Sequence, residues 1–258
     1  MSERVGDVLL DHEGPVWRAT IDRPEARNAI SLGVVDGLEA AVARAAAAGA
    51  AVLAVRGAGG TFCAGADLGV VLGGLDDFDG FKRYIVRLAD VLDEIEAAPF
   101  ASVAVVDGFA LAGGCELLLA CDVVVAAEEA RIGDRHLELG LLPGAGGSVR
   151  LLRALSPARA RWLLLSGEML SGREAADWGL VTRAVAAAGL DAAAEAMIAR
   201  LASRSPDALA GAKRMVGSVR DVPVAEGIGL ERDLFFHHME TSPAVRAALA
   251  TFLHKEKA

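Results

Sequence analysis

The chain has 258 residues and a formal net charge of −9, with 53% hydrophobic and 24% charged residues. This composition is typical of a globular protein with a large core and excludes a disordered chain. The negative charge, with no long run of Lys or Arg, argues against a nucleic-acid partner. We expect an α/β fold, with one main domain followed by a helical region.

The cysteines and the apolar segments bear on cellular location. Cys63, Cys115 and Cys121 are odd in number and stand in no metal-binding spacing, which favours reduced thiols, no structural zinc and a cytoplasmic location. Residues 1–16 are acidic and lack the apolar core of a signal peptide, and acidic residues interrupt the most apolar stretch, 101–127. The sequence therefore predicts neither a leader nor a contact with a membrane.

The N-terminal elements are predicted to be a hairpin and a helix. Apolar residues at 8–10 and 16–21 indicate two short strands, joined by a turn at 11–14. Ser31 is a candidate N-cap for an Ala-rich helix that ends at Gly49.

Continuous apolar runs further along the chain predict buried parallel strands. These runs are 51–55, 101–106, 123–127 and, more weakly, 181–185. Because helical segments separate them, we expect a sheet that helices cover on both faces. The first two runs lead into Gly-rich turns, and functional residues in such folds gather where parallel strands end.

Downstream of residue 148 the sequence is predicted to be mainly helical. The candidate N-caps there are Ser171, Asp191, Ser205 and Ser242. Prolines near the predicted helix starts are typical of the first helical turn.

The stretch 111–117 has the clearest chemical pattern, because Glu116 follows three residues after Gly113 at the predicted start of an apolar helix. The first N–H groups of a helix have no intrahelical partner and lie at the positive end of its dipole, so they favour an anion. The carboxylate one turn later could move a proton. A capped turn with a surface glutamate is the alternative.

A second turn, at 61–68, packs small residues after a buried strand and would let a ligand approach the main chain. If the two turns lie side by side, the N–H groups of Ala66 and Gly113 converge on one point. Two converging amides form an oxyanion hole. An ordinary turn between a strand and a loop is the alternative.

Three segments resemble the enoyl-CoA hydratase/isomerase family, also called the crotonase family, in the family's order and spacing. They are Phe62–Leu68, Val106–Asp122 and Gly140–Gly147, and a weaker resemblance extends from Arg23–Ala29 to Phe252–Lys255. The resemblance implies a crotonase-like spiral of strand-strand-helix units with two nearly perpendicular sheets in residues 1–195. It also implies a helical region, 196–258, used to assemble a homotrimer or a homohexamer built as a dimer of trimers.

The resemblance further implies an acyl-CoA substrate, whose thioester oxygen would accept hydrogen bonds from Ala66 and Gly113. By position, the residues expected to contact the substrate or its coenzyme A are Ala26, Arg27, Ala64, Asp67, Leu68 and Lys255. Plain surface positions are the alternative for Arg27 and Lys255. Coenzyme A would enter as part of the substrate, and neither a metal nor any other cofactor is expected.

Only one of the two catalytic glutamates of the family's hydratases is present. Glu116 matches the first, whereas the second lies seven residues before Pro143, at the position of His136. Glu138 is two residues out of register, which on a helix turns a side chain by about 200°, so we expect it at the surface rather than as a replacement. His136 could donate a proton or hold a water molecule, or it could simply pack in the pocket.

This difference leaves several reactions open, of which hydration of a 2-enoyl-CoA thioester is the expected one. Glu116 would then activate water while His136 supplies a proton. Glu116 alone could move a double bond between positions 3 and 2, as an enoyl-CoA isomerase does, and His136 could activate water for an acyl-CoA hydrolase. A non-catalytic CoA-binding protein is a further alternative, against which the retained Glu116 and both amide-bearing turns argue.

Overall fold

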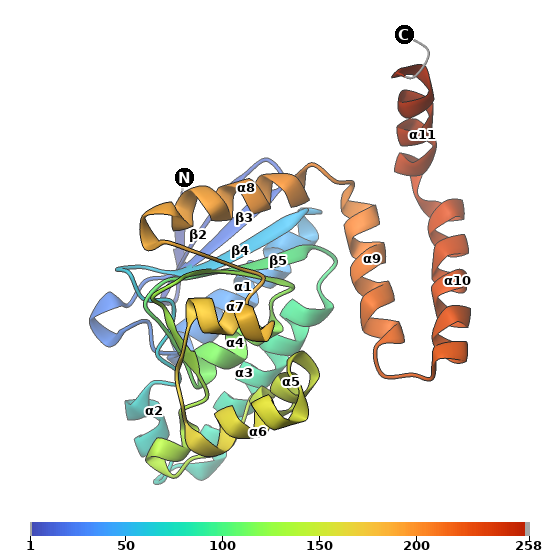
Figure 1. The fold of residues 1–258 in the computed structure, drawn as a ribbon. Coiled ribbons are helices and arrows are strands. Elements are labelled where there is room, and N and C mark those ends of the chain that lie inside the picture. The colour runs from blue at the N-terminus through green and yellow to red at the C-terminus, as the bar shows by residue number, and fades with distance from the viewer. Residues whose placement is uncertain (1, 256–258) are drawn as a thin grey trace.

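The computed structural model describes residues 2–255, with side chains up to residue 253, as a body built on two sheets and a helical arm (Figure 1). In spatial order, the strands of the larger sheet are β1 (Glu3–Val5), β2 (Val8–Glu13), β3 (Val16–Ile21), β4 (Val52–Gly57), β5 (Ala101–Val106), β7 (Val123–Ala127) and β10 (Arg183–Val185). Those of the smaller sheet are β6 (Phe109–Leu111), β8 (Arg131–Gly133) and β9 (Leu170–Ser171).

From β3 onward the strands of the large sheet run parallel, and the chain alternates between the two sheets. It passes from β5 to β6, then through α4 (Gly113–Ala120) to β7 and β8. Strand-strand-helix units therefore follow one another as a spiral. Every residue of β5 is buried, as its continuous apolar sequence predicts for a strand covered on both faces.

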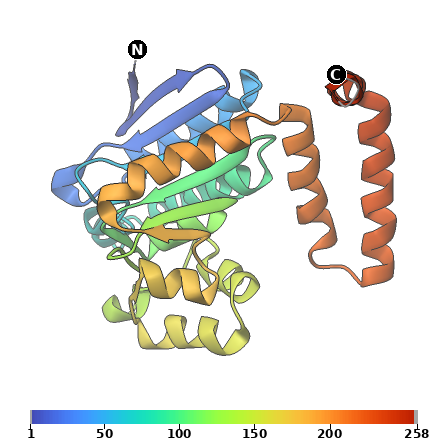
Figure 2. The ribbon, with the colours of Figure 1, turned by 45° about the horizontal axis from the view of Figure 1, so that its top comes forward.

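Helices lie on both faces of the large sheet. Figure 2 shows α8 (Leu190–Ala202) across one face, while α1 (Leu32–Ala47) packs on the other. The remaining helices are α2 (Leu68–Gly73), α3 (Phe78–Ala97), α5 (Gly147–Ala154), α6 (Pro157–Ser166), α7 (Gly172–Trp178), α9 (Pro206–Val219), α10 (Val224–Thr241) and α11 (Pro243–Lys255). Short 3-10 helices are η1 (Pro24–Ala26), η2 (His136–Leu139) and η3 (Ala187–Gly189). No helix within residues 2–255 is long and apolar enough to cross a bilayer.

The predicted hairpin is present, but its turn lies further along the chain than 11–14. The first strand continues to Glu13, which pairs with Val16, and the connection is made by residues 14 and 15. Gly14 has φ of 54°, the left-handed conformation that a short hairpin turn needs and that glycine adopts without strain. The turn therefore forms where glycine stands rather than at the centre of the polar tetrad.

Helix starts were predicted with mixed success. The Ser31 hydroxyl accepts a hydrogen bond from the Val34 N–H at 3.1 Å, and Ser171 forms a capping box with Glu174, as N-caps do. Asp191 is not an N-cap, because α8 starts one residue earlier and leaves Asp191 inside its first turn. An acidic side chain interacts favourably with the helix dipole both at the N-cap and in the first turn, so the residue type alone does not distinguish the two positions.

The arm consists of α9, α10 and α11 and stands beside the body (Figure 1). The expected boundary between residues 195 and 196 falls inside α8, whose buried side chains, among them Ile198, pack against the sheet. The helical region therefore starts after α8. Lys213 joins the arm to the body, since its ammonium group donates to the Ile95 and Phe100 carbonyls and to Asp122. Arg220, which caps the C-terminus of α9, pairs with Glu96 of α3 at 3.3 Å.

The two Gly-rich turns predicted to lie side by side do so. Cys63 forms a parallel bridge with Ala110, and its carbonyl accepts from the Leu111 N–H at 3.0 Å. Gly114 makes this approach possible, because a Cβ added there would lie 2.1 Å from the Cys63 carbonyl oxygen.

We predict that Gly114→Ala destabilises the fold, because the added methyl group meets rigid backbone. Overpacking of this kind costs about 1–3 kcal/mol in the free energy of unfolding, which denaturant titration measures. Gly73→Ala is the matched control, since a Cβ at Gly73 meets no atom within 4 Å. Equal unfolding midpoints for Gly114→Ala and the unmodified protein would contradict the packing described.

Candidate active site

Glu116 is a buried carboxylate held by backbone N–H groups. It lies in the first turn of α4 and is 2% exposed. Its Oε1 accepts from the N–H of Ala145 at 2.9 Å and from that of Gly147 at 2.8 Å. Ala145 lies in the Gly-rich segment before α5 and Gly147 is the first residue of that helix, so the start of α5 orients the carboxylate and leaves its Oε2 directed elsewhere.

Arg150 anchors the segment that holds Glu116. Its buried guanidinium donates to the Ala145 carbonyl at 2.8 Å and pairs with Asp93 and Glu96 of α3. The arginine thus connects α3 to the backbone that binds the carboxylate.

His136 lies between two carboxylates. Its Nδ1 is 3.0 and 3.1 Å from the two carboxylate oxygens of Asp134, and its Nε2 is 4.0 Å from Oε2 of Glu116. All three side chains are largely buried. The structure therefore brings together the two expected catalytic residues and adds a third group, Asp134, behind the imidazole.

This environment changes the proton affinity of both groups. Burial raises the pKa of Glu116, and the opposing effects of the two N–H donors and of His136 do not cancel it. Burial by itself would lower the pKa of His136, but the hydrogen bond and charge of Asp134, with the charge of Glu116, outweigh burial and raise it. The site thus favours a protonated imidazole next to a carboxylate that can take up a proton.

The N–H groups of Ala66 and Gly113 lie next to each other. Ala66 bridges Ile30, and the bonds of that bridge are made by Gly65 and Asp67, which leaves the Ala66 N–H unused. A Cβ added to Gly113 would lie 3.3 Å from the Ala66 nitrogen. Within residues 2–255 neither N–H donates to a protein oxygen, so both can serve a ligand.

A cavity of about 130 Å³ lies beside Ala66 and His136. Its lining includes Ala64, Ala66, Leu68, Ala112 and His136. A ligand oxygen at the two amides would thus lie in the same cavity as the imidazole.

Ala26 and Arg27, also expected near coenzyme A, lie beside Ala64. Arg27 follows η1, which ends at Ala26, and its carbonyl accepts from the Ala64 N–H at 3.0 Å. Its guanidinium lies 5.8 Å from the centre of the Phe109 ring. Leu68 is exposed at the edge of the cavity. The side chain of Lys255 lies outside the described part of the chain.

Asp67 has a different place from the one expected. Its Oδ1 accepts from the Gly69 N–H at 2.9 Å as the N-cap of α2, and its Oδ2 binds the Arg23 guanidinium at 2.9 Å. Both oxygens are therefore engaged within the protein, which indicates a structural role, and the expected contact with substrate stays a prediction. Glu138 is exposed and pairs with Arg135 at 3.2 Å, so it does not replace the second glutamate.

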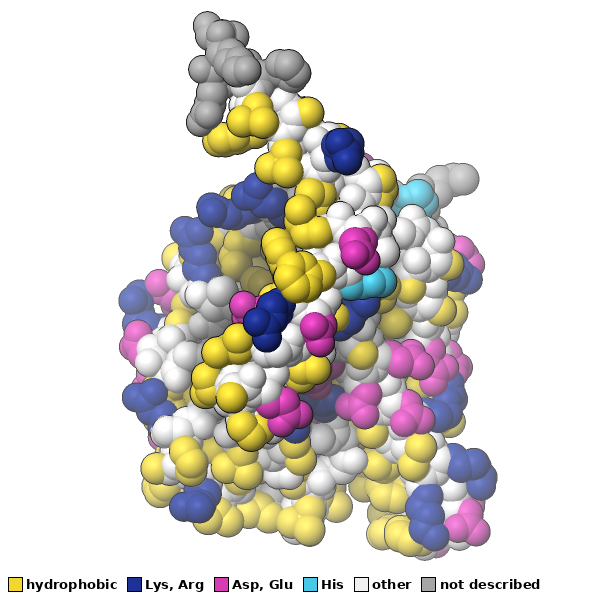
Figure 3. Space-filling view, turned by 90° about the vertical axis from the view of Figure 1, so that its right-hand side faces the viewer, with side chains coloured by type: hydrophobic (Ala, Val, Ile, Leu, Met, Phe, Trp, Pro, Cys, Tyr) yellow, Lys and Arg dark blue, Asp and Glu magenta, His cyan; other side chains and the backbone are white. Residues whose placement is uncertain are grey.

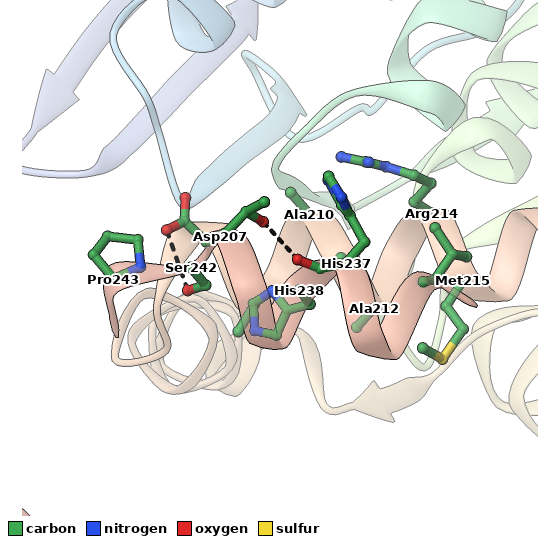
Figure 4. A pocket seen from close by; sticks show the side chains of 13 residues that line it. Asp207, Ala210, Ala212, Arg214, Met215, His237, His238, Ser242 and Pro243 are labelled. Carbon is green, nitrogen blue, oxygen red and sulfur yellow. Dashed lines mark hydrogen bonds between the residues drawn. The ribbon is translucent and has the colours of Figure 1, made fainter. Parts of the chain in front are cut away.

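A larger cavity lies elsewhere, between α9 and α10 (Figure 4). It has about 640 Å³ and its lining includes Asp207, His237, His238 and Ser242. None of the residues expected to contact substrate lines it, so size does not identify the site.

The sequence placed Asp134 at the acyl pocket, but it predicted neither the contact of Asp134 with His136 nor the role of Asn28. Asp134 stands two residues before His136, a spacing that has no meaning until the chain turns from β8 into η2. Asn28 is fully buried and donates to the carbonyls of Ala58 and Thr61, bracing the turn that carries Ala66. The role of a buried asparagine can be recognised only when its hydrogen-bond partners are known in space.

Comparisons with known proteins agree on the class of this chain. Residues 11–258 match the family described as enoyl-CoA hydratase/isomerase. A Rhizobium meliloti protein named "Probable enoyl-CoA hydratase" is 38% identical over 97% of this chain and 96% of its own length. A 2,3-dehydroadipyl-CoA hydratase of Escherichia coli is 34% identical over 90% of this chain and 89% of its own length. The crystal structure of a Bacillus anthracis enoyl-CoA hydratase superposes with a TM-score of 0.90, at 29% identity over 96% of each chain.

We predict that Glu116→Gln stabilises the fold at alkaline pH. Because burial raises the pKa of Glu116, the unfolded chain releases this proton first as the pH rises, and folding stability falls between the unfolded and the folded pKa. Glutamine avoids this loss. Tm should rise by about 2 °C or more at pH 8 and should match the unmodified protein at pH 4. Thermal unfolding at both pH values, with Glu138→Gln as the surface control, measures the difference, and a lower Tm at pH 8 would argue against it.

Proposed function

We propose that this chain, which belongs to the enoyl-CoA hydratase/isomerase family and has the crotonase fold, adds water to a 2-enoyl-CoA thioester. The observation that carries the proposal is the placement of His136 Nε2 4.0 Å from Glu116 Oε2, in a site that also holds two unused N–H groups. Relatives named as hydratases support the same reaction.

In the proposed reaction the thioester oxygen accepts hydrogen bonds from Ala66 and Gly113. Negative charge develops on this oxygen as water adds, and preorganised donors stabilise that charge more than the neutral thioester. Glu116 takes a proton from water, whose oxygen bonds to C3, while the His136 imidazolium gives its Nε2 proton to C2. Transfer of the proton from Glu116 to His136 then restores both groups.

Two other reactions have support in the same geometry. The raised pKa of Glu116 suits a single group that removes and returns a proton, as Δ3-Δ2 isomerisation requires. The contact of His136 with Asp134 suits a base that activates water for thioester hydrolysis. Hydration is preferred because it gives both groups a role: the raised pKa of Glu116 makes its carboxylate a stronger proton acceptor, and the raised pKa of His136 favours the protonated ring that acts as the acid.

We further propose that coenzyme A lies along Ala26, Arg27, Ala64 and Leu68, with Lys255 as an additional phosphate contact. Coenzyme A arrives as part of the substrate, and the proposed steps use no metal or other cofactor. The cytoplasmic location expected from the cysteines stays a prediction.

Assembly as a homotrimer or a dimer of trimers is proposed to use the arm. Figure 3 shows hydrophobic side chains along its outward face. The exposed ones include Val224, Ile228, Phe235, Phe236 and Phe252. Apolar side chains in such numbers on two neighbouring helices support burial against another subunit.

The first test follows the absorbance of the conjugated thioester and the product mass with 2-enoyl-CoA and 3-enoyl-CoA substrates. Hydration predicts loss of absorbance and a mass gain of one water from the 2-enoyl compound. Glu116→Gln should lower kcat by about 100-fold or more, since it cannot accept the proton, and Glu138→Gln should not. A rise in absorbance from 3-enoyl-CoA alone would establish isomerisation, release of free thiol would establish hydrolysis, and coenzyme A binding without turnover would exclude all three reactions.

The second test concerns the paired amides. Gly113→Val should lower kcat by about 100-fold, because its side chain would enter the space beside the Ala66 nitrogen. Gly189→Val is the control, as a Cβ at Gly189 meets no atom within 4 Å. Normal turnover by Gly113→Val, with the fold checked by circular dichroism, would remove Gly113 from the reaction.

A further inference from the structure

Asp134 contacts a single nitrogen, Nδ1, of the His136 imidazole. It lies just after β8 and is 2% exposed. Both its oxygens lie within 3.1 Å of Nδ1 of His136, and Oδ1 also accepts from the His136 backbone N–H at 3.2 Å. A carboxylate can only accept hydrogen bonds, so Nδ1 is the nitrogen that carries a proton in every state of this ring.

This contact decides what the other nitrogen can do. With Nδ1 protonated, Nε2 is an acceptor in the neutral ring and a donor only in the imidazolium. The charged groups that face the ring are Asp134, from its own segment, and Glu116, from α4. Arg135 also lines the cavity, where its guanidinium binds the Gly167 carbonyl and pairs with Glu138. Arg150, from α5, is engaged with α3. With both arginines paired elsewhere, the charges that act on the ring are those of two carboxylates, and they favour the imidazolium.

The three groups can carry the same net charge as a pair of glutamates. Two glutamates that share one proton carry a net charge of −1. Glu116 and Asp134 as carboxylates, with His136 as imidazolium, carry the same net charge and hold one transferable proton. The buried aspartate thus compensates for the histidine.

We propose that Asp134 is a positioning residue that holds His136 as an imidazolium with its Nε2–H directed at the substrate, so that His136 can act as the acid. This inference rests on the proposed hydration for its effect on turnover. Its effect on the ring itself does not depend on the reaction.

Asp134→Asn tests the charge while keeping the shape of the side chain. Without the anion, His136 loses its proton at lower pH, and an acid is active only below its pKa, so the alkaline limb of the kcat profile moves to lower pH. We expect a loss in kcat of about tenfold at pH 8, a smaller loss at pH 6, and KM within about twofold. Glu138→Gln is the control and should keep the profile. An equal loss at every pH would overturn the proposal.

The ring can be followed without substrate. The imidazole signals of His136, assigned by their absence in His136→Gln, should titrate at lower pH in Asp134→Asn than in the unmodified protein. If they titrate together, the proposal is wrong even if hydration is observed. If they separate but no substrate is hydrated, the proposed reaction fails while the effect of Asp134 on the ring stands.

A double variant gives the sharpest result, because the proposal predicts a change of sign. In His136→Glu the aspartate would lie against a second carboxylate and repel it. Adding Asp134→Asn to His136→Glu should therefore raise kcat several-fold, although the same change lowers kcat in the unmodified protein. A loss in both backgrounds would indicate that Asp134 only supports the fold and would overturn the proposal.

Discussion

The burial of the Glu116 carboxylate is the constraint on which the rest of the site depends. A carboxylate removed from water is costly unless hydrogen bonds and an opposite charge replace its hydration. Two backbone N–H groups bind one of its oxygens, and the imidazole of His136 faces the other. This close approach explains the glycine at the start of α5, since a Cβ at Gly147 would lie 3.0 Å from Oε1 of Glu116.

The same constraint relates the fold to the proposed chemistry. Burial raises the pKa of Glu116, while nearby anions raise the pKa of His136. Neither property belongs to the residue type, because an exposed glutamate is ionised and an exposed histidine is largely neutral at pH 7. The parallel strands make these properties possible by ending at one edge, where α4 and η2 start close to the cavity.

The parts of the fold that the sequence predicted are those that depend on local patterns. The buried strand at 101–106 is a continuous apolar run, and the start of α1 at Ser31 is a capping signal, so both are readable from neighbouring residues. The paired amides of Ala66 and Gly113 were predictable because each lies in a turn of small residues. What could not be predicted depends on contacts between distant segments. The role of Asp67 depends on its ion pair with Arg23, and the point where the body ends depends on the packing of α8 on the sheet.

The contacts of Glu96 relate the helical arm to the buried carboxylate. This side chain pairs with Arg220 at the end of α9 and with Arg150, which binds the carbonyl of Ala145, whose N–H in turn binds Glu116. The contacts that hold α9 against the body and those that hold the Glu116 carboxylate are therefore joined through Glu96 and Arg150. A substitution on the arm that shifts α9 would therefore act first on the Arg220–Glu96 pair, and Arg150, the other partner of Glu96, binds the backbone next to the carboxylate.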